Sequence, residues 1–260
     1  MGLLLTSSIL ASALTLSSQS NSEQVRSRSQ VQTAVEQQTR VGKLLWDQHE
    51  VTVESVRRYA QATGFVSQAE KEGGGFIYEA GWTRKLGWTW RTPFGQRANE
   101  MEPAVHLTFT EAKAICNFFG KRLPTDSEWT GAAYLEQRQT PPTGFVEGIR
   151  YPFPGGHSPM VSHCLEGCGD YQGLAPSGSL WRGSGHVKAM QTRPGVNGLW
   201  DMGGNAWEWV DTKLASEPVT RGGSWWYGPE RQVENDVATK PADTRVAYIG
   251  FRCVQDLRTE

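Results

Sequence analysis

Apolar side chains recur at helical spacing near the start of the folded part of the chain. Val53, Val56 and Ala60 fall on one face of a helix, and Gly64 follows as a stop signal. This pattern predicts a first amphipathic helix over residues 51–63.

Two further helices are predicted by capping boxes, in which a hydroxyl and a carboxylate three residues apart each satisfy a free backbone N–H. Thr108 and Glu111 form the first box, and Thr125 and Glu128 form the second. An apolar stripe follows the first box and ends at Gly120, and a set of residues suited to burial follows the second. These apolar positions are Ala112, Ile115, Cys116 and Phe119, then Trp129, Ala132 and Ala133.

The remaining segments show little regular periodicity. Residues 65–95 are rich in Gly and Trp and indicate loops with short strands, and residues 141–198 are rich in Gly and Pro. Short strands are predicted at 207–210, 219–226 and 247–254. Long irregular loops inside a compact domain usually carry function or need a covalent staple.

The N-terminal segment differs in composition from the rest. Residues 1–16 are apolar and rich in small residues, with an Ala-Ser-Ala stretch, and are typical of a secretory signal peptide. The Lys or Arg that usually stands before the apolar run of such a peptide is missing. They are too short for a membrane span, which needs about 20 residues. We expect a signal peptide at 1–16, a polar linker at 17–40, a single domain at 41–260 and a periplasmic or secreted protein.

Composition narrows the functional class. The 260 residues include 26 Lys and Arg against 27 Asp and Glu, so the net charge is -1. Proteins that bind nucleic acids usually carry a basic excess, so no nucleic-acid partner is expected. With 29 Gly and 11 Trp, the chain favours a turn-rich domain pinned by large aromatic side chains.

Four cysteines permit three pairings into two disulfides. Cys164 and Cys168 are close enough in sequence for a local disulfide. A local disulfide or two unpaired thiols is the favoured interpretation. Half of a zinc site is the alternative, because His157 and His163 are near and structural zinc takes four nitrogen or sulfur ligands.

Four motifs occur together in a defined order. They are KRLPTDSEW at 121–129, NGLWDMGGNAWEW at 197–209, RGGSW at 221–225 and IGFRC at 249–253. In order and spacing the chain resembles the formylglycine-generating enzyme (sulfatase-modifying factor) family over residues 45–254. The resemblance implies an α+β fold of the elaborated C-type-lectin-like kind, with few regular elements and long loops.

The resemblance also implies a structural calcium site. The side chains of Asp201 and Glu208 and the backbone oxygens of Gly204 and Ala206 occupy the matching positions. Carboxylate and carbonyl oxygens are the hard ligands that Ca²⁺ requires, and Asp201 keeps an oxygen donor where the family usually has Asn.

The resemblance implies a disulfide between Cys116 and Cys253, because the family pairs the matching positions, and it leaves open whether Cys164 and Cys168 form a second one. The family's catalytic feature is a further pair of cysteines that binds copper, and these positions are Tyr227 and Gln232 here. Copper(I) favours thiolate ligands, so genuine formylglycine generation is not expected. The residues expected to line an active site in the matching region are Trp207, Ser224, Tyr227, Glu230 and Arg231, with Trp226 in the same loop. Of these, Tyr227 and Arg231 are expected on the exposed rim of the site.

Two functions remain open. The first is an exported oxidoreductase or maturation factor that acts on a peptide or a peptide-derived small molecule, as in the PvdO-like branch that matures a siderophore chromophore; its redox cofactor is unidentified. A branch that uses non-haem iron is excluded, since the five histidines do not form its His-x-x-x-His-x-Glu motif. The second is a non-catalytic, lectin-like binding module that uses Trp226 and Tyr227 as an anchor.

Overall fold

The computed structural model describes residues 37–257. The predicted signal peptide, most of the predicted linker and residues 258–260 lie outside this range. The helices are α2 (Val53–Thr63), α3 (Gln68–Lys71), α4 (Phe109–Phe118) and α5 (Asp126–Tyr134), with 3-10 turns η1 (Pro159–Val161), η2 (Val196–Gly198) and η3 (Pro229–Gln232). The strands are β1 (Gln38–Val41), β2 (Leu44–Asp47), β3 (Phe76–Tyr78), β4 (Trp82–Arg84), β5 (Trp207–Leu214), β6 (Glu217–Arg221), β7 (Ala238–Thr239), β8 (Ile249–Gly250) and β9 (Val254–Asp256).

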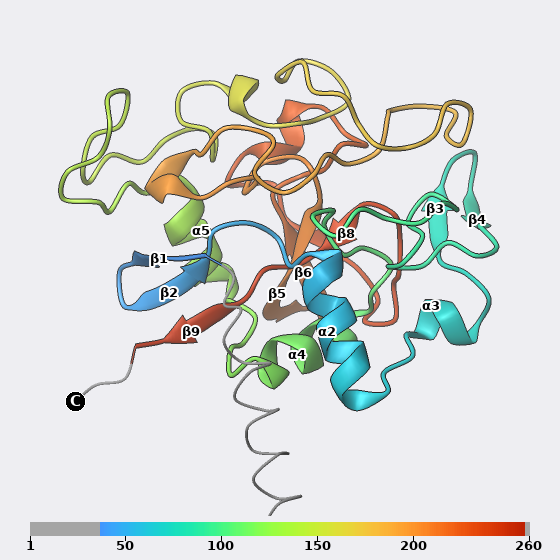
Figure 1. The fold of residues 1–260 in the computed structure, drawn as a ribbon. Coiled ribbons are helices and arrows are strands. Elements are labelled where there is room, and N and C mark those ends of the chain that lie inside the picture. The colour runs from blue at the N-terminus through green and yellow to red at the C-terminus, as the bar shows by residue number, and fades with distance from the viewer. Residues whose placement is uncertain (1–36, 258–260) are drawn as a thin grey trace, which may run out of the picture. The chain divides into compact units, whose positions relative to one another are not determined.

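The largest sheet has the strand order β7-β6-β5-β8. Strands β5 and β6 are antiparallel and place Glu208 opposite Arg221, and β8 pairs with β5 in parallel, with Ile249 opposite Trp207. A second sheet has the order β1-β2-β9, and β3 and β4 form a separate hairpin. In Figure 1 the long irregular segment between α5 and β5 lies on one side of the β5–β6 pair, and α2 and α4 lie on the other.

The three predicted helices are confirmed. Helices α4 and α5 each begin with the predicted capping box, in which Glu111 and Glu128 close back onto Thr108 and Thr125. Helix α2 begins at Val53, because the Thr52 side chain accepts a hydrogen bond from Ser55 N and so caps the helix.

Several predicted boundaries were wrong. The strand predicted over 207–210 continues to Leu214 in β5. The strand predicted over 219–226 ends at Arg221, because Gly222 and Gly223 have φ values of 98° and 77° that a strand does not allow. The strand predicted over 247–254 is divided into β8 and β9. The predicted linker extends too far, since its last three residues, 38–40, belong to β1 and pair with β2.

The core is aromatic-rich and covalently tied. Trp209 and Phe251 are fully buried between the largest sheet and the helices, with Cys116 and Cys253 in the same cluster. Cys116 of α4 and Cys253 form a disulfide across 137 residues of sequence. Within residues 37–257, no helix is both long and apolar enough to cross a membrane.

Candidate functional site

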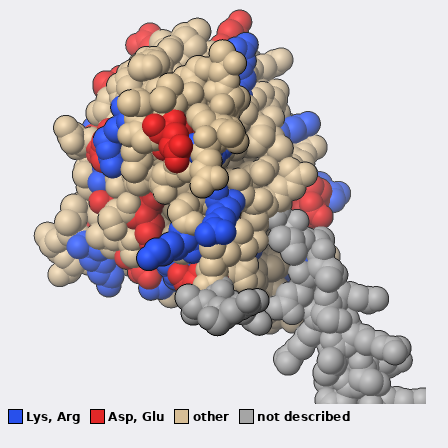
Figure 2. All heavy atoms as spheres, turned by 90° about the vertical axis from the view of Figure 1, so that its left-hand side faces the viewer, with Lys and Arg blue, Asp and Glu red and all other residues tan. Residues whose placement is uncertain are grey.

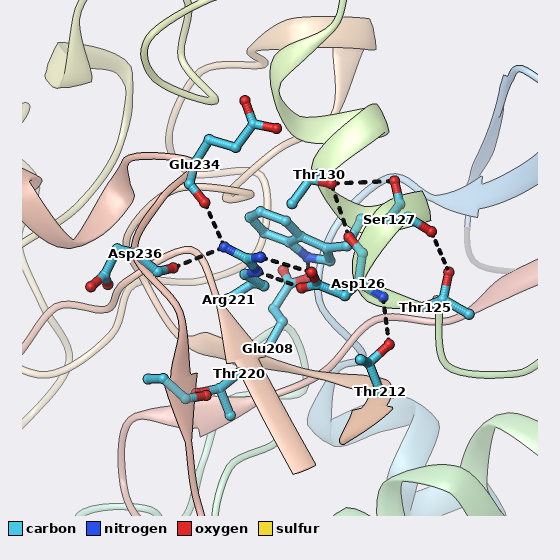
Figure 3. Close-up of polar contacts among 12 residues, drawn as sticks. Thr125, Asp126, Ser127, Thr130, Glu208, Thr212, Thr220, Arg221, Glu234 and Asp236 are labelled. Carbon is cyan, nitrogen blue, oxygen red and sulfur yellow. Dashed lines mark hydrogen bonds and ion pairs between the residues drawn. The ribbon is translucent and has the colours of Figure 1, made fainter. Parts of the chain in front are cut away.

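The loop that follows β6 carries most of the predicted site residues, and Arg221 fixes its position (Figure 3). The Arg221 guanidinium donates to both carboxylate oxygens of Asp126 at 2.5 and 2.8 Å. It also donates to the backbone oxygens of Glu234 and Asp236, at 2.6 and 3.0 Å. One arginine therefore joins the start of α5, the end of β6 and the far end of the loop.

Two glycines then turn the chain back toward β5. A Cβ on Gly222 would lie 2.5 Å from the backbone oxygen of Met202, so a larger residue would force the two segments apart. Beyond the turn, Trp225 N donates to the backbone oxygen of Asn205 at 2.9 Å. This contact brings the loop against the segment that leads into β5.

Four aromatic side chains meet there: Trp207, Trp226, Tyr227 and Tyr248, called here the aromatic cluster. The Tyr227 ring meets Trp207 and Tyr248 edge-on, with centroids 6.0 Å apart in both pairs. Trp226 stacks on Tyr248 at 6.1 Å. Such contacts fix the orientation of each ring beyond what burial alone achieves.

Two arginines lie over these rings. The Arg231 guanidinium is 5.3 Å from the centre of Trp207 and 5.6 Å from that of Tyr227, and Arg182 is 4.8 Å from that of Trp226. Arg231 pairs with Asp236 at 2.8 Å, and Arg182 donates to the Trp226 backbone oxygen at 2.5 Å. The Nε atoms of both arginines find no hydrogen-bond partner in the described part of the chain. Both Nε atoms are buried, so an additional acceptor would reach these arginines at the more exposed part of the guanidinium.

Burial keeps the two phenols neutral. It raises the pKa of Tyr227 and of Tyr248, whose rings meet edge-on. Arg231 acts on Tyr227 in the opposite direction but is the smaller influence. Tyr227 is therefore suited to donating a hydrogen bond at neutral pH and not to acting as a base.

Ser224 and Glu230, which were also predicted for the site, are not part of the aromatic cluster. Ser224 is buried, and its hydroxyl accepts a hydrogen bond from Trp226 N at 3.3 Å, so it shapes the turn. Glu230 is exposed in η3. Tyr227 and Arg231 were expected on an exposed rim, which was wrong: both are half-buried because the rings of the cluster cover them.

Sequence reasoning missed Arg182, Asp236 and Tyr248. Tyr248 lies in a segment that was interpreted only as a strand, and Asp236 lies in a loop without a motif. The pair Trp181-Arg182 was the one available signal, since an aromatic residue beside a cation in a Gly-rich loop is typical of a binding surface.

The two positions that match the copper-binding cysteines do not fit that metal. Tyr227 presents a phenol. Gln232 is buried, its Oε1 accepts from Ser162 Oγ at 2.9 Å, and its Nε2 donates to Cys168 Sγ at 3.2 Å. Neither side chain is a thiolate, which is the ligand that copper(I) favours.

The predicted calcium ligands lie among three buried carboxylates, those of Glu50, Asp201 and Glu208. Arg252 donates to both oxygens of Glu208 at 2.5 to 2.9 Å, and Trp129 Nε1 donates to the same carboxylate at 2.7 Å. The Glu208 carboxylate is thus already occupied by protein donors.

The other two carboxylates are less well satisfied. Asp201 Oδ1 accepts from Thr192 at 2.6 Å and Glu50 Oε1 accepts from Asn205 at 3.0 Å, but Asp201 Oδ2 and Glu50 Oε2 have no partner among residues 37–257. Burial, with the neighbouring carboxylates, raises the pKa of Glu50, and burial raises the pKa of Asp201 to about 6. The donor set of Asp201 and Glu50 fits a hard cation, whereas Glu208 would have to share its oxygens with Arg252.

The cysteine alternatives are resolved by geometry. Cys164 and Cys168 are joined in a disulfide, so they do not form half of a zinc site. In residues 37–257, no three side chains of His, Cys, Asp or Glu are grouped so that they alone could hold a metal.

A hollow of about 930 Å³ lies elsewhere, between the β1-β2-β9 sheet and α5. Its carboxylates, Glu128 and Asp256, are both paired with Arg122. Figure 2 shows the face with β1, β2 and β9, where basic and acidic side chains are interspersed. No convergent set of unpaired polar groups marks this hollow as a site among the described residues.

Comparison with known proteins identifies the family. A family model described as the sulfatase-modifying factor enzyme 1-like domain matches residues 13–257. The formylglycine-generating enzyme of Thermomonospora curvata is 27% identical over 267 residues, covering 84% of this chain and 83% of that protein. The inactive C-alpha-formylglycine-generating enzyme 2 of Bos taurus is 30% identical over 180 residues, covering 63% of this chain and 55% of that protein.

A solved structure shows the same fold. PvdO from Pseudomonas aeruginosa superposes with a TM-score of 0.57 at 16% identity, covering 82% of this chain and 80% of that one. The predicted α+β, elaborated C-type-lectin-like fold is thereby confirmed.

Proposed function

The chain belongs to the sulfatase-modifying factor enzyme 1-like family, and we propose that it is an exported oxidoreductase or maturation factor that binds a peptide or a peptide-derived small molecule at the aromatic cluster. The observation that carries this proposal is the position of Arg231 over both Trp207 and Tyr227. Family membership, the two disulfides and this arrangement support it together.

The side chains have distinct roles in this proposal. Trp207, Trp226 and Tyr248 are at most 2% exposed, so a planar or apolar group would rest against the half-buried Tyr227 at the edge of the cluster. The half-buried guanidinium groups of Arg182 and Arg231 would bind carboxylate or carbonyl oxygens of the substrate. The neutral Tyr227 hydroxyl orients one further acceptor. A redox cofactor would supply the electron chemistry, and these residues bind and orient the substrate beside it.

Formylglycine generation is not the proposed activity. The phenol of Tyr227 and the amide of Gln232 replace the two thiolates on which that reaction depends. A relative from Bos taurus whose name describes it as inactive shows that the family includes members without this reaction.

The finer proposal is a PvdO-like role in the maturation of a siderophore chromophore. The shared fold and the aromatic cluster, which would accommodate the planar ring of a chromophore, support this role. A structural Ca²⁺ is proposed as well, bound by Asp201 with Glu50, Glu208 and the backbone oxygens of Gly204 and Ala206; it would neutralise excess negative charge beneath the loop that leads into Trp207.

A deletion strain tests the proposal. Untargeted comparison of metabolites and secreted peptides should show an immature, more reduced precursor that accumulates without the gene and disappears when the wild-type gene is restored. The purified protein should leave a Cys-x-Pro-x-Arg peptide unchanged with and without copper, as judged by mass spectrometry. An unchanged profile in the deletion strain would contradict the enzyme proposal, and formylglycine in the peptide would contradict the assignment of activity.

A lectin-like binding module is the second candidate. Trp181 is 63% exposed and meets Trp226 edge-on at 6.0 Å, so it extends the aromatic cluster to the surface. Under this alternative a ligand identified by binding would be recovered chemically unchanged, whereas the enzyme would convert it.

A further inference from the structure

The two disulfides differ in accessibility. Cys116 and Cys253 are at most 1% exposed. Cys168 is half-buried, and Glu166 and Gly167, inside the loop that it closes with Cys164, are exposed. Of the two disulfides, Cys164–Cys168 is therefore the one that a substrate thiol reaches more readily from solvent.

The two sulfurs of this disulfide also have different surroundings. Gln232 Nε2 donates to Cys168 Sγ at 3.2 Å. The Ser162 hydroxyl donates to Gln232 Oε1 at 2.9 Å and so orients this amide. A donor such as this amide N–H stabilises a thiolate. Cys164 Sγ lies 3.1 Å from the backbone oxygen of Glu166, which suits a protonated thiol. The pair is thus asymmetric, with Cys168 favoured as thiolate and Cys164 favoured as thiol.

The disulfide loop lies beside the aromatic cluster. Leu165 N donates to the backbone oxygen of Tyr227 at 3.0 Å, and a Cβ on Gly167 would lie 3.3 Å from the Pro229 ring. A molecule bound at the cluster is therefore close to Cys168.

We propose that Cys164–Cys168 is a redox-active disulfide that oxidises a dithiol, such as two cysteines of a peptide, by thiol–disulfide exchange. This is a second activity beyond the proposed function, and it requires no bound metal or cofactor.

The exchange is balanced within the two molecules. A substrate thiolate attacks Cys168 Sγ, the Cys164–Cys168 bond breaks, and Cys164 leaves and takes up the proton that the substrate thiol released. The second substrate thiol loses its proton to water, and its thiolate attacks the substrate sulfur of the mixed disulfide and releases Cys168 as a thiolate, next to the Gln232 amide. Two electrons pass from the dithiol to the protein, and one substrate disulfide forms for each protein disulfide opened.

The first test uses dithiothreitol as the dithiol, with Cys116–Cys253 as an internal control. The folded protein is exposed to a small excess, quenched with iodoacetamide and mapped by mass spectrometry, while circular dichroism follows the fold. We expect Cys164–Cys168 to open at least about 10-fold faster than Cys116–Cys253, because Cys168 is the more exposed and because its stabilised thiolate is the leaving group when the mixed disulfide is resolved. The circular dichroism spectrum should stay unchanged, and one oxidised dithiothreitol should form for each bond opened. Equal rates, or opening only as the fold is lost, would overturn the proposal.

The second test isolates the role of Gln232. The iodoacetamide alkylation rate of Cys168 is measured against pH in a Cys164→Ser background, with Gln232 or with the similarly shaped Gln232→Met. Loss of the donor should move the midpoint of the rate curve to higher pH and slow alkylation at pH 7 about 5-fold. Coincident curves would show that Gln232 does not stabilise the thiolate. These measurements need no knowledge of the substrate at the aromatic cluster, so their failure would leave the proposed function intact.

Discussion

Arg221 and Asp126 are 95 residues apart in sequence, yet the Arg221 guanidinium meets both oxygens of the Asp126 carboxylate. Asp126 is the first residue of α5, and Arg221 is the last residue of β6. Their contact, together with the two backbone oxygens that Arg221 also reaches, holds the loop that carries Arg231. The position of the candidate site therefore depends on an ion pair outside it.

Replacing this arginine should destabilise the domain and loosen the loop. Arg221→Ala should lower the free energy of unfolding by about 3 kcal/mol, because it leaves Asp126 and two carbonyl oxygens without their donor. Urea unfolding measures the loss. The control is Arg150→Ala, which removes an exposed ion pair with Glu234 on the same loop and should cost less than about 1 kcal/mol. Equal losses in the two variants would contradict the anchoring role of Arg221.

The calcium proposal predicts that a chelator lowers the melting temperature. At a calcium concentration about 100-fold above Kd, the stabilisation would be about 2.7 kcal/mol. Asp201→Gly should abolish the effect, and Asp201→Asn should retain part of it, because it keeps an oxygen donor. Both residues tolerate the φ of 57° at this position.

Glu208→Ala is a poor test of the same site. It would leave Arg252 and Trp129 without their acceptor and would destabilise the protein whether or not calcium binds. Scanning calorimetry of the Asp201 variants, with and without chelator, is the informative measurement. An unchanged wild-type melting curve, in protein shown by metal analysis to have lost calcium on chelation, would contradict a stabilising site.

The buried His106 predicts a loss of stability in mild acid. Burial lowers its pKa from 6.5 to about 4, so between these values the unfolded chain takes up a proton that the folded protein excludes. The stability that the neutral, buried His106 gives the folded protein is fully present above pH 6.5. As the pH falls toward 4, the free energy of unfolding decreases by about 3 kcal/mol because of this residue. The raised pKa of Asp201 acts in the opposite direction over a similar range, so the total curve does not isolate His106.

A matched variant isolates it. His106→Gln retains a donor for the backbone oxygen of Pro93, which His106 Nε2 contacts at 3.0 Å, but cannot be protonated. Urea unfolding at pH 7.5 and pH 4 should show the stability gap between wild type and variant narrowing by about 3 kcal/mol. If the free energies of unfolding of wild type and variant changed by the same amount between pH 7.5 and pH 4, this account of His106 would be contradicted.

The aromatic cluster predicts a graded response to substitution. Arg231→Ala and Tyr227→Ala should each reduce restoration of the deletion phenotype at least about 10-fold, because each removes a group that contacts the proposed ligand. Tyr227→Phe should lose only the hydrogen bond and have a smaller effect. Arg97→Ala, at an exposed arginine that is not part of the aromatic cluster, serves as the control.

Stability must be measured alongside function. The melting temperatures of the Tyr227 and Arg231 variants should stay within a few degrees of wild type, because both side chains are only half-buried. Full restoration by a Tyr227→Ala, Arg231→Ala double variant would show that the cluster is not the functional site.

Local sequence determined where α4 and α5 begin. The capping pairs Thr108–Glu111 and Thr125–Glu128 act within one helical turn, so their outcome needs no distant partner. The ordered motifs also identified the family and its fold, because together they specify a particular packing of loops around the largest sheet.

Tertiary structure alone decided the chemistry of the site. Arg182 and Tyr248 join Trp226 from segments far apart in sequence, and Gln232 meets Cys168 across 64 residues. The Arg252–Glu208 ion pair likewise joins residues 44 positions apart in sequence. It occupies a carboxylate that was predicted as a calcium ligand. These contacts depend on how two loops without periodicity pack against each other. Sequence spacing fixes a side chain only relative to its own helix or strand, so such contacts cannot be predicted from local pattern.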